Sequence, residues 1–133
     1  MNTPKESMND LFVRVMRGDH VFTPEVVYDA SADCVTYFHE DVAVNGDWID
    51  PFVTIYWEIQ SGRPVGFKVK CVRTIVAAIA IRDATVATRA VTFEEVVDAA
   101  AKLSKDAQSK AREREQVRNS ELAGVEIPRE AYA

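Results

Sequence analysis

Residues that build reactive or cross-linked sites are scarce in this chain of 133 residues, which has two cysteines and two histidines. Cys34 and Cys71 both fall inside predicted strands, so we expect buried free thiols rather than a disulfide. The cysteines and histidines lack the close spacing of a zinc motif. We therefore expect neither a metal nor a cofactor.

Long apolar runs are also missing, because Lys68, Lys70, Arg73 and Arg82 interrupt the apolar stretches before they reach membrane-spanning length. We expect no membrane partner. The first ten residues lack a basic region followed by an apolar one, so they predict no secretory signal. The expected location is the cytoplasm.

The sequence contains no nucleophile elbow, phosphate loop or helix with two histidines. Its best catalytic candidate is His39, which could act as an acid–base group if the following loop brought Asp47 or Asp50 close. However, His39 and Glu40 are neighbours in a predicted strand and should point to opposite faces. We expect no enzymatic activity. An enzyme or metal-dependent domain using His39 and the loop carboxylates is the alternative.

Positive charge is absent from residues 18–62, which hold nine acidic residues and no lysine or arginine. Such a field repels nucleic acid and attracts cationic surfaces. The acids could simply cap and solubilise turns, form a hard-cation site, or bind a basic protein. The carboxylates we expect to contact such a partner are Asp29, Asp33, Glu40, Asp41, Asp47 and Asp50.

Two strands joined by a turn are predicted within residues 51–73, around which the rest of the chain is organised. Apolar residues fall on odd numbers on both sides of the turn at 61–64. Matching these faces predicts a register that sets Glu58 opposite Lys68 and Tyr56 opposite Lys70 on the outer face. Trp57 shares the apolar side and is a predicted core residue.

The remaining elements are read from periodicity and capping. Residues 3–18 predict a helix with an apolar stripe, and 92–103 predict another that starts with a capping box. Short strands are expected at 26–28 and 34–40, and a loop at 41–50 with a turn at Asn45-Gly46-Asp47. The run from 74 to 91 fits either a helix or a strand.

These elements predict an α+β fold: a small antiparallel β-meander of about four strands, packed by an N-terminal helix and C-terminal helices. We expect a single domain over residues 1–121, with its sheet core at about 26–73. Residues 122–133 are then a C-terminal tail.

The C-terminal segment loses its apolar stripe after Leu103 yet ends with scattered apolar residues. We expect it to dock on a partner or on a second copy of the chain, giving a homo-oligomer. The alternative is that it folds back over the outer face of the sheet near Phe52 and Tyr56. The tail residues in question are Leu122, Val125, Ile127 and Tyr132.

Residues 26–72 contain three short motifs: Tyr28-Asp29, Ala32-Asp33 before a strand, and Ser61-Gly62 followed by Val65-Gly66-Phe67-Lys68-Val69. Through these motifs this part of the chain resembles a family of small bacterial domains of unknown function. The usual pattern is Y-D-x-x-A-D, then D-x-x-G-x-x-V-G-I-E-I. The resemblance implies a compact antiparallel meander and no established activity.

The function we expect is that of a non-catalytic acidic protein-binding domain. The acidic span suggests an inhibitor, antitoxin or immunity-type partner of a basic, nucleic-acid-handling protein. The same charge argues against direct binding of nucleic acid. A self-associating module is a further alternative.

Overall fold

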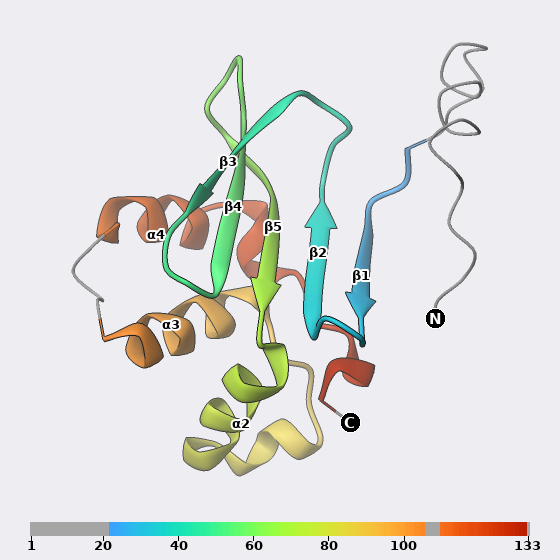
Figure 1. Ribbon diagram of the computed structural model, residues 1–133, viewed down its shortest axis with the longest axis vertical. Helices are drawn as coiled ribbons and strands as arrows, with labels where there is room; N and C mark the ends of the chain where they lie inside the picture. Colours follow the sequence, from blue (N-terminus) through green and yellow to red (C-terminus); the bar gives the residue numbers. More distant parts are fainter. Residues whose placement is uncertain (1–21, 106–109, 133) are drawn as a thin grey trace.

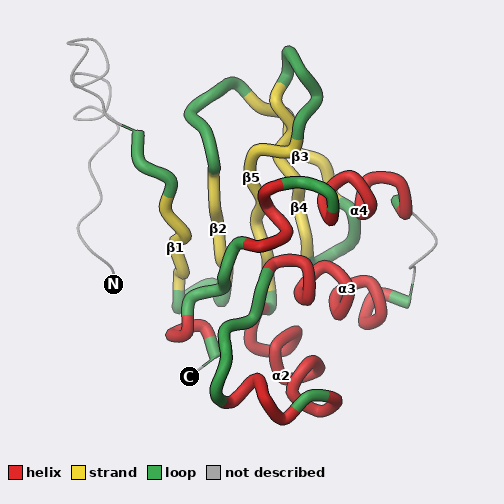
Figure 2. Tube along the Cα trace, turned by 180° about the vertical axis from the view of Figure 1, so that it is seen from behind, coloured by secondary structure: helices red, strands yellow, loops and turns green. Residues whose placement is uncertain are grey.

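The computed structural model describes residues 22–105 and 110–132, which form one five-stranded antiparallel sheet with helices on one face (Figures 1 and 2). This confirms the α+β class and the antiparallel sheet, with five strands rather than about four. The predicted N-terminal helix at residues 3–18 lies outside the described residues.

The strands run in the spatial order β1-β2-β5-β4-β3, so the last strand in the chain lies at the centre of the sheet. The chain therefore does not follow a simple meander, because β2 is followed by a crossing to the far edge. The strands are β1 (Glu25–Asp29), β2 (Cys34–Phe38), β3 (Val44–Trp48), β4 (Val53–Glu58) and β5 (Pro64–Lys70).

The third strand occupies the region that the sequence predicts as a loop with a turn. Asn45 lies opposite Trp57, Gly46 opposite Tyr56 and Asp47 opposite Ile55. The prediction was wrong because turn preferences are local, whereas pairing with β4 supplies a ladder of backbone hydrogen bonds along the whole segment.

The register of β4 against β5 also differs from the prediction. Lys68 lies opposite Thr54 rather than Glu58, and a bulge interrupts the pairing between Tyr56 and Trp57. The backbone N–H of Glu58 donates to the Arg63 carbonyl, with Gly62 at φ 72° in the loop. This loop closes the hairpin earlier than predicted, and the bulge restores the match between the apolar faces.

The run from 74 to 91, where the sequence leaves helix and strand open, begins inside helix α2 (Val72–Arg82). Val72, Ile75 and Val76 recur at helical spacing and are buried. Burial of that stripe outweighs the weak helix preference of β-branched residues. A short 3-10 helix, η1 (Ala84–Ala87), follows, and the Asp83 carboxylate accepts from the Thr85 N–H at its start.

Helix α3 (Phe93–Ser104) confirms the predicted helix and its capping box between Thr92 and Glu95. Its buried face includes Phe93, whose ring stacks on Phe67 of β5 with centroids 3.7 Å apart and planes 5° from parallel. The core of the molecule thus lies between one face of the sheet and the helices. α3 joins the middle strand to this core.

The C-terminal segment is part of the same core. Helix α4 (Ala111–Arg118) buries Val117, and the short helices η2 (Glu121–Gly124) and η3 (Arg129–Ala131) follow it. Leu122 and Ile127 are 1% and 2% exposed. The segment is therefore neither a separate tail nor a cover for the outer face near Phe52 and Tyr56.

Backbone hydrogen bonds fix this segment beside the start of α3. The Phe93 N–H donates to the Val125 carbonyl, and the Ile127 N–H donates to the Val91 carbonyl. The sequence does not signal these contacts, because the buried residues follow no helix or strand period. Val125 and Tyr132 are half-buried at the edge of the core.

Two other burial predictions are changed by local geometry. The bulge leaves Trp57 half-buried at the edge of the core, while Ile59 lies 56% exposed in the loop. Both cysteines are free, but Cys34 is only half-buried. Cys71 is exposed, and its backbone has the left-handed conformation, at φ 58°, just before α2. In the described part of the chain, the helices are too short or too polar to cross a bilayer.

Candidate functional site

Two of the acidic residues predicted to bind a partner hold helix α4 instead. The Asp50 carboxylate is 1% exposed and accepts hydrogen bonds from the N–H groups of Phe52 and Val53 at 2.7 and 2.9 Å. Its other oxygen faces the buried guanidinium of Arg114 at 3.7 Å. Asp47 pairs with Lys110 at 3.4 Å.

The acidic residues of the first hairpin close its turn and meet α2. The Asp33 carboxylate accepts from the Tyr28 hydroxyl at 3.0 Å and from the backbone N–H of Arg73. Burial and this carboxylate raise the pKa of the Tyr28 hydroxyl, with burial the larger cause. Asp29, which is exposed, accepts from the Ser31 hydroxyl at 2.7 Å.

At the other end of the sheet, Arg63 gathers two carboxylates. Its guanidinium lies 2.8 Å from Glu40 and 3.0 Å from Glu58. Hydrogen bonds from the Ser61 hydroxyl and then from Arg63 lower the pKa of Glu58. Asp41 is exposed in the following loop. Much of the acidic span is thus matched by bases within the chain.

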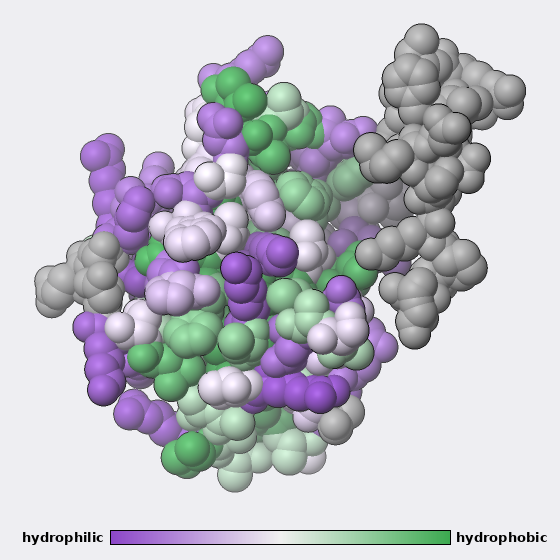
Figure 3. Space-filling view, viewed as in Figure 1, coloured by the Kyte–Doolittle hydropathy of each residue, from purple (hydrophilic) through white to green (hydrophobic). Residues whose placement is uncertain are grey.

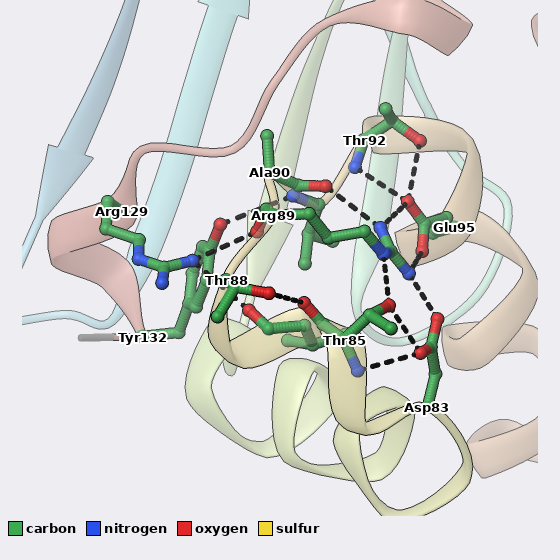
Figure 4. Close-up of polar contacts among 11 residues, drawn as sticks. Asp83, Thr85, Thr88, Arg89, Ala90, Thr92, Glu95, Arg129 and Tyr132 are labelled. Atoms are coloured by element: carbon green, nitrogen blue, oxygen red, sulfur yellow. Dashed lines mark hydrogen bonds and ion pairs between the residues drawn. The ribbon is translucent and has the colours of Figure 1, made fainter.

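The half-buried Tyr132 belongs to a polar network around the connection between α2 and α3 (Figure 4). The Arg89 guanidinium lies between Asp83 and Glu95, at 2.6 and 2.7 Å. The Tyr132 hydroxyl accepts from the Val91 N–H at 3.3 Å. The Arg129 guanidinium donates to the carbonyls of Val86, Ala87 and Arg89. These groups fasten the end of the chain and leave little donor capacity for a ligand.

His39 is half-exposed and has different neighbours from those expected. Its Nδ1 lies 3.0 Å from the Tyr37 hydroxyl, and its Nε2 contacts the exposed carboxylate of Glu121. Burial, and secondarily the charge of Glu121, raise the pKa of Tyr37. Asp47 and Asp50 are engaged with α4, so the acid–base site expected from these residues does not assemble in this form.

Within residues 22–105 and 110–132, no group of three His, Cys, Asp or Glu side chains is placed so that it could hold a metal ion. Comparison with known proteins adds no assignment. No family model matches the chain, and no curated protein or solved structure is detectably similar to it.

The face of the sheet opposite the helices is covered by no described helix (Figures 1 and 2). A row of directly paired residues crosses all five strands on this open face. Trp48 and Val27 at its two ends are 67% and 50% exposed. From β1 to β3, the row is Val27, Thr36, Lys68, Thr54 and Trp48.

A second row on the open face places two aromatic rings next to two glycines. Phe38 pairs with Gly66, Gly66 with Tyr56, and Tyr56 with Gly46. A Cβ added to Gly66 would lie 2.7 Å from the Phe38 ring, and one on Gly46 would lie 3.1 Å from the Tyr56 ring. The glycines thus let both rings lie close to neighbouring strands, with their centroids 4.8 Å apart.

Positive charge lies in the middle of the open face. Lys68 is at the centre of the first row, and the Lys70 ammonium lies 5.5 Å from the centroid of the Trp48 ring, within cation–π range. Glu25 and Asp29 lie on the outer strand β1 at the margin. Figure 3, seen from this side, shows apolar residues interspersed with polar ones.

A shallow hollow of about 440 Å³ lies at the β1 side of the open face. Its lining includes Phe22 and Thr23, which precede β1, together with Val27, Phe38 and Lys68. The chain before β1 therefore arrives next to the open face.

The sequence does not identify Trp48 and Val27 as surface residues. The Asn45-Gly46-Asp47 pattern instead predicts a loop around Trp48. The signal that could have found it is the alternation of Val44, Gly46 and Trp48, which now share the open face with Tyr56. Alternation alone does not say which of the two faces a helix covers.

Proposed function

We propose that this chain is a non-catalytic protein-binding domain that docks its partner on the open face of the sheet. The observation that carries the proposal is Trp48, a large aromatic residue 67% exposed on a sheet face that no described helix covers. Aromatic residues are enriched among those that dominate binding energy at protein interfaces. We further propose an inhibitor, antitoxin or immunity-type role in the cytoplasm.

The charges of the open face suggest the chemistry of the partner. Lys68 and Lys70 lie beside the aromatic residues, so the best complement is a protein surface with apolar side chains and carboxylates. Nucleic acid fits less well because the chain carries a net charge of −5 and Glu25 and Asp29 border this face.

The basic partner predicted from the acidic span stays a prediction with less support. Asp50, Asp47, Glu40 and Asp33 all have internal contacts that compete with a partner. Leu122 and Ile127 support neither a docking segment nor a homo-oligomer, since both are buried.

The test compares Trp48→Ala with Ile81→Ala. Ile81 is 85% exposed on α2, away from the sheet, and provides a matched loss of an exposed apolar side chain. A protein captured from the source cells is purified, and its affinity for each variant is measured. We expect Trp48→Ala to weaken binding about 30-fold, as an interface residue contributing about 2 kcal/mol would. Ile81→Ala should leave the affinity unchanged.

Capture alone does not support the proposal. Equal affinity of wild type and Trp48→Ala, with both proteins folded by circular dichroism, would refute docking on the open face. Weaker binding in Lys68→Glu identifies an acidic partner surface. If only Asp41→Lys weakens binding, the partner surface is basic. If nuclease treatment abolishes capture, the partner is a nucleic acid rather than a protein.

A further inference from the structure

We propose that the chain's own residues 1–21 occupy the open face when no partner is bound. The inference goes beyond the proposed function, and only its regulatory consequence rests on that function. Covering the face with this segment would bury Trp48 and Val27 and turn the two-layer fold into three layers.

The segment ends next to the open face. Residues 1–21 are followed by Phe22, which is half-buried and lines the hollow on the open face with Val27, Phe38 and Lys68. The four residues from 18 to 21 can span up to about 13 Å. An element that ends near Gly18 is therefore within reach of the middle of the sheet.

The size and apolar pattern of the segment also suit the open face. The helix predicted for residues 3–18 would be about 24 Å long, and five strands span about 19 Å between the outer two. Its apolar positions fall on one side of a helix, while Val13 falls on the other. Those apolar residues are Met8, Leu11, Phe12, Val15 and Met16.

A second copy of the chain is a poorer occupant of the open face. A two-fold axis through the middle of the open face would bring Lys68 and Lys70 against the same lysines of the other copy. Like charges facing each other in an interface oppose association. The edge strand β1 resists antiparallel self-pairing as well, because Glu25 would lie opposite Asp29 of the other copy.

The experiment measures quenching of Trp48 fluorescence by acrylamide in the full chain. Trp57→Phe serves as the background, so that Trp48 is the only tryptophan. We expect weak quenching in this background, a several-fold increase on adding Leu11→Asp, and no change on adding Val13→Asp. The last two variants introduce the same charge on opposite sides of the predicted helix.

A reciprocal background checks the fold. With Trp48→Phe, only the half-buried Trp57 reports, and its quenching should not respond to Leu11→Asp. Efficient quenching of Trp48 in the unaltered segment would overturn the inference, as would protection that disappears on dilution. Neither result refutes the proposed function, which is tested separately by the affinity of the Trp48→Ala variant for its partner.

If the segment covers the face, a partner must displace it. The full chain would then bind more weakly than the Leu11→Asp variant, and Val13→Asp would bind like wild type. This comparison uses the partner identified above. Equal affinities would remove the regulatory consequence and leave the fluorescence result standing.

Discussion

Arginine side chains join separate elements of this molecule. Arg63 brings together Glu40 and Glu58, Arg89 lies between Asp83 and Glu95, and Arg114 reaches the buried turn before β4. The planar guanidinium has several fixed donors, so one side chain can serve two carboxylates or a carboxylate and carbonyls together. Stability should therefore depend on the ionisation of particular carboxylates.

Asp83 provides the clearest case. Hydrogen bonds from the Thr85 hydroxyl and from Arg89, with the Thr85 N–H, lower the pKa of Asp83 from 3.8 to about 2. Because the folded-state pKa is lowered, the carboxylate stabilises the fold above the unfolded pKa, and this is lost as the pH falls from 3.8 through about 2. Glu95, whose pKa Arg89 also lowers, adds to the same trend.

We expect Asp83→Asn to melt at a lower temperature than wild type at neutral pH and to approach wild type as the pH falls through this window. Thermal unfolding followed by circular dichroism at a series of pH values measures the difference. Parallel melting curves at all pH values would show that Asp83 contributes nothing through its charge.

At the level of elements, β5 depends on the absence of a side chain at Gly66. A Cβ at this position would lie 2.6 Å from the Tyr37 carbonyl and 2.7 Å from the Phe38 ring, so both the ladder to β2 and the aromatic pair require glycine. A glycine inside a strand usually weakens it, and a neighbouring aromatic ring can compensate.

Gly66→Ala should destabilise the protein by about 1–3 kcal/mol, because backbone and ring must both move to admit the methyl group. Gly124→Ala is the matched control, since no heavy atom lies within 4 Å of its added Cβ. That change should be neutral or stabilising by up to about 1 kcal/mol. Urea unfolding of both variants gives the comparison, and equal stabilities would contradict the close approach of β2 at Gly66.

At the scale of the whole molecule, the unequal charge distribution has an internal explanation. The acidic stretch 18–62 is attached to the C-terminal part of the chain through Asp47 with Lys110, Asp50 with Arg114 and His39 with Glu121. The two parts are complementary, and the most buried contact is Asp50 with Arg114, at 1% and 2% side-chain exposure.

Arg114→Met should cost about 3–5 kcal/mol of unfolding free energy, because it leaves the Asp50 carboxylate buried without its counter-charge. Adding Asp50→Asn should recover part of this loss, since the amide oxygen still accepts from Phe52 and Val53. Arg118→Met removes a half-exposed pair with Asp98 and should cost about 1 kcal/mol or less. Urea unfolding of the three variants tests the order, and equal losses in both single variants would contradict it.

The sequence predicted the parts of the fold that are governed by local rules. The capping box at Thr92 and Glu95 and the apolar stripe behind it defined α3, and alternation found most of the strands. The register of the central hairpin was not predictable, because it depends on a bulge at Tyr56 and Trp57 that alternation does not encode. Strand β3 was missed because Asn45-Gly46-Asp47 is typical of a turn, whereas its pairing with β4 is a contact that no local pattern records.

The candidate site was harder to predict than the fold. Acidic residues in turns suggested an exposed binding surface, but Asp50 and Asp47 found partners more than 60 positions away in the sequence. Trp48 can be identified as an exposed residue only when it is known which face of the sheet the helices cover. The helices cover the face of the sheet on which they contact Phe67 and its neighbours. These contacts are long-range, so no short sequence motif predicts which face it is.

The central position of β5 has a consequence for how the protein emerges from the ribosome. Synthesis delivers the β1–β2 hairpin and the β3–β4 hairpin first, yet in the sheet β5 lies between them and pairs with both β2 and β4. Until residues 64–70 leave the exit tunnel, two separate hairpins present unpaired edges on β2 and β4, and such edges favour misassembly. The nascent chain should therefore acquire its tertiary structure late, in a step that unites both hairpins around the last strand.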